Sequence, residues 1–107
     1  MLTWSTPSFE RYLEAIRKRR AYLMDASGLS SIGLDRTLDW LHNWLHKQET
    51  LSEEDEVYLS KPYNRSVRKL ICILAKEQYG IETDDTVEDE LHTIRCYMWC
   101  RNEIERR

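Results

Sequence analysis

Histidine and cysteine recur at one-turn spacing in two parts of the chain. His92, Cys96 and Cys100 follow one another four residues apart, and His42 and His46 repeat that spacing earlier. On a helix, side chains four residues apart lie on the same face, one above the other. Two such helices packed side by side would offer His42, His46, Cys96 and Cys100 as the mixed nitrogen and sulfur shell that zinc accepts. A zinc-stabilised helical bundle is therefore one hypothesis for this chain.

The spacing favours an ordinary interpretation of the same residues. Structural zinc sites commonly hold their cysteines close together on tight turns, whereas Cys96 and Cys100 fall within a predicted helix. A free cysteine packs as a small apolar side chain, and a histidine at the edge of an apolar stripe is commonly solvated. Cys72, on the polar side of another predicted helix, belongs to neither set. We therefore prefer packing over metal binding and expect no cofactor.

No familiar catalytic motif occurs in the sequence. It lacks a G-x-S-x-G elbow, a glycine-rich phosphate loop, an H-E-x-x-H pair and an EF-hand loop. The carboxylates of residues 84–85 and 88–90 open a predicted helix, where the helix dipole accounts for them. We expect a protein that is not an enzyme.

Length and composition predict a single helical domain over residues 1–107. The chain is 41% apolar and 33% charged, with a formal net charge of −3. This apolar content is enough for a folded core, and no apolar run approaches the roughly 20 residues that cross a bilayer. Three cysteines cannot all pair with one another, which favours a reducing compartment. We expect a cytoplasmic protein that does not bind membranes.

Apolar spacing and capping residues predict an all-α fold, a compact bundle of four to five helices joined by short loops. Apolar residues recur at three- and four-residue steps, and no segment alternates with a period of two. Pro7 marks a helix start, Gly28 and Gly80 mark helix ends, and the stretch from Ser27 to Gly33 is predicted as a loop. Asp85 is predicted to cap the last helix. The expected helices span about residues 7–27, 34–45, 53–60, 64–79 and 85–105.

The last predicted helix has two apolar faces. One face is a core stripe that consists of Val87, Leu91, Ile94 and Met98. The opposite face consists of His92, Cys96, Trp99 and Cys100. A helix that is apolar nearly all round is buried on both sides. Either this helix lies at the centre of the bundle, or its second face meets a partner chain, which includes a second copy of the protein.

The second face suggests a contact surface. Trp99 is the candidate anchor, because tryptophan and tyrosine are the side chains most used at protein interfaces. Cys96 and Cys100 lie beside it, and Arg95 and Arg101 flank it, where they could pair with acidic groups of a partner. The favoured hypothesis is a non-enzymatic protein–protein interaction module that acts as a small intracellular regulator, adaptor or inhibitor of a larger complex. An accessory protein of phage or plasmid type fits that description.

Nucleic-acid binding is the main alternative. Four basic residues of the fourth predicted helix could contact phosphate, namely Arg65, Arg68, Lys69 and Lys76. Against this, the preceding helix begins with four acidic residues, which a duplex would repel. The overall acidic balance also differs from the basic surfaces typical of nucleic-acid modules. The sequence therefore disfavours a nucleic-acid partner.

Overall fold

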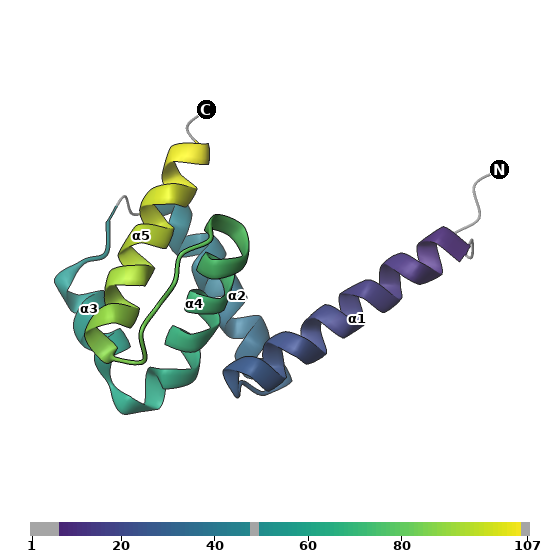
Figure 1. Cartoon of the computed structure of the whole chain (residues 1–107), viewed down its shortest axis with the longest axis horizontal. Helices are drawn as coiled ribbons and strands as arrows, with labels where there is room; N and C mark the ends of the chain where they lie inside the picture. The colour runs from purple at the N-terminus through teal and green to yellow at the C-terminus, as the bar shows by residue number, and fades with distance from the viewer. Residues whose placement is uncertain (1–6, 48–49, 106–107) are drawn as a thin grey trace.

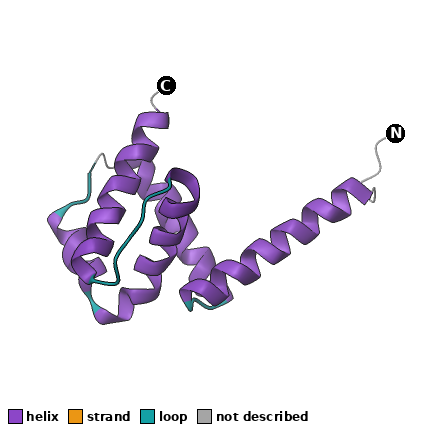
Figure 2. Cartoon of the chain, viewed as in Figure 1, coloured by secondary structure: helices purple, strands orange, loops and turns teal. Residues whose placement is uncertain are grey.

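The computed structural model describes residues 7–47 and 50–105, with side chains for residues 9–43 and 50–104. This part of the chain is helical and contains no strand (Figure 2). In chain order the elements are α1 (Pro7–Ser27), α2 (Ser31–Lys47), α3 (Glu53–Ser60), the 3-10 turn η1 (Pro62–Asn64), α4 (Arg65–Tyr79) and α5 (Val87–Glu105). The predicted all-α bundle is confirmed.

Glycine ends two of these helices, as predicted. Gly28 has a φ of +82° and Gly80 a φ of +69°, values that glycine adopts without a steric penalty. The Gly80 N–H donates to the Lys76 carbonyl at 2.9 Å. The Ile81 N–H donates to the Ala75 carbonyl at 3.4 Å. These bonds satisfy carbonyl groups that the last turn of α4 leaves unpaired.

The predicted loop between the first two helices is too long. α2 begins at Ser31, so Gly33 lies inside the helix instead of in the loop. The reason is Ser30, whose hydroxyl accepts the Gly33 N–H at 3.1 Å and whose carbonyl accepts the Leu34 N–H at 2.8 Å. Such N-capping by serine starts a helix even when glycine follows it.

The predicted cap of the last helix is also wrong by one residue. The Thr86 hydroxyl, and not the Asp85 carboxylate, accepts the Asp89 N–H at 3.1 Å. The Thr86 carbonyl accepts the next N–H, that of Glu90, at 3.0 Å. α5 accordingly begins at Val87.

The core lies where α5 packs against α2, α3 and α4 (Figure 1). Its largest fully buried apolar side chains come from α2, α3, α4 and α5, namely Leu34, Leu59, Leu70, Ile71, Ile94 and Met98. α5 therefore occupies a central place in the bundle. Its predicted core stripe is buried at Ile94 and Met98 and more open at Val87.

α1 extends away from the bundle over its first half (Figure 1). Its second half docks: Leu23 is buried, Arg19 pairs with Glu77 of α4 at 2.5 Å, and Arg20 pairs with Asp35 of α2 at 2.6 Å. The Cα radius of gyration is 15.7 Å, whereas a compact domain of this length has about 13 Å. The projecting half of α1 accounts for this difference.

Candidate functional site

The predicted contact face of α5 is only partly open. The Trp99 side chain is 63% exposed, and Cys96 and Cys100 are half-buried beside it. Arg95 is exposed but forms an ion pair with Glu56 of α3. Arg101 is half-buried and also has contacts within the chain. Trp99 thus has the exposure that an interface anchor needs, while the flanking arginines are already engaged.

Among the described residues, the candidate zinc ligands come together only as a pair. His92 Nε2 lies 3.7 Å from Cys96 Sγ on α5, as the one-turn spacing predicts. His42 is exposed on α2, and the His46 side chain lies outside the described residues. In the described part of the chain, no group of three or more His, Cys, Asp or Glu side chains could hold a metal ion. Cys96 and Cys100 therefore have no third or fourth ligand among these residues.

One of the four candidate phosphate-binding residues is inaccessible. Arg68 is 3% exposed, and its Nε donates to Glu90 Oε1 at 3.0 Å. Its Nη1 donates to the carbonyls of Leu59 at 2.5 Å and Lys61 at 2.9 Å. Arg68 therefore joins the C-terminal end of α3 to α5, and its guanidinium is not exposed for contact with phosphate.

The other three basic residues do not form an open cluster. Arg65 is exposed at the start of α4, and Lys69 lines a pocket that also contains acidic side chains. Lys76 Nζ lies 3.4 Å from Glu82 Oε2. Neighbouring carboxylates weaken attraction for phosphate, so the basic side of α4 is a poor nucleic-acid surface.

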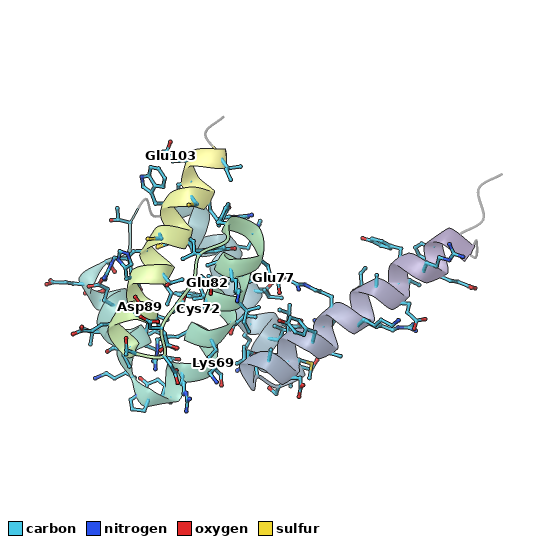
Figure 3. The ribbon with its side chains drawn as sticks, in the orientation of Figure 1. Lys69, Cys72, Glu77, Glu82, Asp89 and Glu103 are labelled. Carbon is cyan, nitrogen blue, oxygen red and sulfur yellow. The ribbon has the colours of Figure 1, made fainter. Side chains whose placement is uncertain are left out.

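A pocket of about 330 Å³ lies where the loop between α4 and α5 crosses α4. Figure 3 shows Lys69, Cys72 and Glu82 on this side of the bundle, and all three line the pocket. The Cys72 Sγ lies 4.0 Å from the Glu90 carbonyl. Burial raises the pKa of Cys72 to about 11, because the thiolate loses hydration. A thiol in this state is a poor nucleophile at neutral pH, so the pocket does not offer cysteine catalysis.

A further site is a partly apolar groove beside α3, here called the α3 groove. It is lined by Glu53, Glu54, Val57, Tyr58, Lys61 and Tyr63. The rings of Tyr58 and Tyr63 pack edge to face with centroids 6.2 Å apart. Both residues are nevertheless exposed, Tyr58 to 51% and Tyr63 to 72%. Tyr58 also lines a second hollow with Arg36, Trp40 and Val67. Aromatic side chains from three elements therefore border one continuous surface.

Sequence reasoning counted Tyr58 and Tyr63 among many aromatic residues but placed the contact surface at Trp99, so it did not find this groove. The signal that could have found it is the run Val57-Tyr58-Leu59. Successive residues of a helix point about 100° apart, so three adjacent apolar side chains cannot all face one core. The structure buries Leu59 and leaves the other two exposed.

No protein-family model, curated protein or solved structure matches this chain. Across the described residues, every helix is too short or too polar to cross a membrane. The geometry of the chain itself is therefore the basis for a proposal about function.

Proposed function

We propose that this protein acts by contact with another protein, as a small regulator, adaptor or inhibitor without catalytic activity. The α3 groove carries this proposal, because it presents two packed tyrosine rings to solvent. Its occupant is a protein segment with an apolar side chain flanked by lysine or arginine. Two properties of the groove support this choice.

The first property is preorganisation. Because Tyr58 and Tyr63 already pack against each other, a partner does not have to order these rings on binding. Tyrosine has few rotatable bonds and offers a large apolar area with a polar tip, which suits an interface anchor. Less conformational entropy is then lost on association, and more of the interaction energy remains as affinity.

The second property is charge. Glu53 and Glu54 border the groove and stand in the first turn of α3, whose four residues are all acidic. Lysine or arginine on a partner would therefore be attracted to the edge of an aromatic surface. Lys61 also lines the groove, where its ammonium group would attract an acidic group of the partner.

Affinity purification with quantitative mass spectrometry tests the proposal. The tagged chain would be recovered from the cells in which it is made, as wild type and as the double variant Tyr58→Ala/Tyr63→Ala. Loss of two anchor residues weakens an interface by about 2 kcal/mol or more, so recovery of the partner should fall by at least about tenfold. Both rings are exposed, so the circular dichroism spectrum should not change.

Tyr22→Ala is the matched control, because Tyr22 is an equally exposed tyrosine on α1. It should retain the partner. Trp99→Ala tests the α5 face in the same experiment. If Trp99→Ala releases the partner and the tyrosine variant does not, the contact surface lies on α5 and not at the α3 groove. The wild type could instead recover nucleic acid, and the double variant Arg65→Glu/Lys69→Glu could fail to recover it. That result would contradict a protein-contact function.

A further inference from the structure

The first half of α1 carries apolar side chains that the described bundle leaves open. Tyr12 is 61% exposed and Ile16 is 40% exposed, on the same side of the helix as half-buried Leu13. From residue 10 to residue 19 every side chain except Leu13 is exposed. We call Tyr12, Leu13 and Ile16 the free stripe.

The free stripe continues a face that is buried further along the same helix. Leu23 lies seven residues after Ile16 and is almost fully buried against the bundle. Residues seven apart occupy nearly the same angular position on a helix. One apolar face of α1 is therefore covered at its C-terminal half and uncovered at its N-terminal half. In proteins, most of the stability of a helix comes from packing of its apolar face, so the uncovered part of this face indicates a partner.

The charges beside the free stripe indicate which partner. Glu10 and Arg17 are also seven residues apart, so they lie on the same flank of the stripe with opposite charge. Neither residue forms an ion pair with another described residue. Their midpoint, between Leu13 and Glu14, lies inside the exposed segment of residues 10–19.

We infer that α1 pairs with α1 of a second copy in an antiparallel arrangement, about a two-fold axis between Leu13 and Glu14. In an antiparallel pair, the same flank of both helices meets. Glu10 of each copy then faces Arg17 of the other, which is the reciprocal contact that a two-fold interface requires. The Tyr12 ring of one copy lies opposite the small Ala15 of the other. This interface uses a different element from the α3 groove and does not depend on the proposed function.

Charge also excludes the parallel arrangement. In a parallel pair in register, Glu10 of one copy would face Glu10 of the other, and Arg17 would face Arg17. Like charges at such spacing repel. An anionic membrane is the other surface that an amphipathic helix could meet. Residues 10–19 carry four basic and two acidic side chains, so binding to anionic vesicles is an outcome of the test below.

Sedimentation velocity over a range from micromolar to submillimolar concentration tests the inference with the full chain at low salt. The wild type should show a monomer–dimer equilibrium. Glu10→Arg alone or Arg17→Glu alone replaces two attractive contacts by two repulsive ones, so each should weaken the dimer by about tenfold or more. An equimolar mixture of the two single variants should restore association, because opposite charges then face each other in the mixed dimer.

Association of the mixed variants requires that residue 10 of one helix faces residue 17 of the other. Variants whose α1 is unfolded would not associate on mixing. Ile16→Asp should abolish the dimer, whereas Ile32→Asp, at an exposed isoleucine on α2, should not. A wild type that stays monomeric at every concentration overturns the inference, as does a dimer that neither charge reversal weakens. Binding of the monomer to vesicles of anionic lipid, lost with Ile16→Asp, would instead assign the free stripe to a membrane.

Discussion

Cys72 shows how burial changes the chemistry of a single side chain. Its sequence position, on the polar side of α4, suggests a solvated thiol. The loop between α4 and α5 covers that side instead, and burial raises the pKa of Cys72 to about 11 from its ordinary 9.0. Hydrogen bonding to Thr83 lowers the pKa, but the burial effect is larger. The thiol is therefore protonated at physiological pH.

Alkylation of Cys72 should consequently be slow in the folded protein. At pH 8, the thiolate population should be about a hundredfold smaller than in the unfolded chain, since each pKa unit is a tenfold change in population. Iodoacetamide labelling followed by peptide mass spectrometry measures this rate, with the urea-unfolded chain as reference. The rate should rise about tenfold per pH unit between pH 8 and pH 10. Equal rates in the folded and unfolded chain would contradict the burial of this thiol.

The same shift links stability to pH. The folded pKa of Cys72 lies above the unfolded one, so its contribution to stability is complete below pH 9.0 and is lost as the pH rises toward 11. Cys72→Ala should flatten the fall in unfolding free energy across that window relative to wild type. Urea titrations at a series of pH values measure the difference.

At the scale of the elements, caps decide where helices begin more than apolar spacing does. α3 starts after Ser52, whose hydroxyl accepts the Asp55 N–H at 3.1 Å. α5 starts after Thr86 in the same way. The sequence marks both segments with acidic residues, but carboxylates at several neighbouring positions suit a helix N-terminus equally well. The sequence predicts the start of α3 correctly, but only the hydrogen bond to Thr86 shows where α5 begins.

Thr86→Ala should therefore weaken α5, whereas Asp85→Ala should not. Loss of an N-cap side chain destabilises a protein by about 1 kcal/mol. Thermal or urea unfolding followed by circular dichroism compares the two variants with wild type. A larger loss for Asp85→Ala than for Thr86→Ala would show that Asp85 caps α5 in solution.

At the scale of the whole molecule, Arg68 and Glu90 connect three elements through buried charge. Arg68 of α4 pairs with Glu90 of α5 and donates to the carbonyls of Leu59 and Lys61 at the end of α3. Burying such a pair is unfavourable unless its hydrogen bonds are satisfied. Here the guanidinium bridges the carboxylate and both carbonyls, which fixes how α3 sits on α4 and α5.

Glu90→Ala should destabilise the bundle by about 3–5 kcal/mol, because it leaves a buried guanidinium without its carboxylate. Glu82→Ala is the matched control, since the Lys76–Glu82 pair is exposed and should contribute less than about 1 kcal/mol. Urea unfolding measures both. A loss below about 1 kcal/mol for Glu90→Ala would mean that water reaches Arg68 in solution.

The sequence by itself determined the all-α class and most of the helix boundaries. These depend on local interactions: apolar side chains repeat at helical spacing, and the glycines at 28 and 80 end their helices because they adopt positive φ. It also placed Trp99 on the face of α5 opposite the core stripe, and the structure shows that this side chain is exposed. Its role in binding stays a prediction, as does the contact function.

Only the tertiary structure decided which equivalent-looking residues are buried. Arg65 and Arg68 are both basic residues of α4, yet Arg65 is exposed and Arg68 is buried against α3 and α5. Tyr58 and Tyr63 become a groove only because the turn at Pro62 folds one ring against the other. Spacing along a helix gives the direction of a side chain, but burial depends on which other segments pack there. That packing brings together residues far apart in the sequence, which local patterns do not encode.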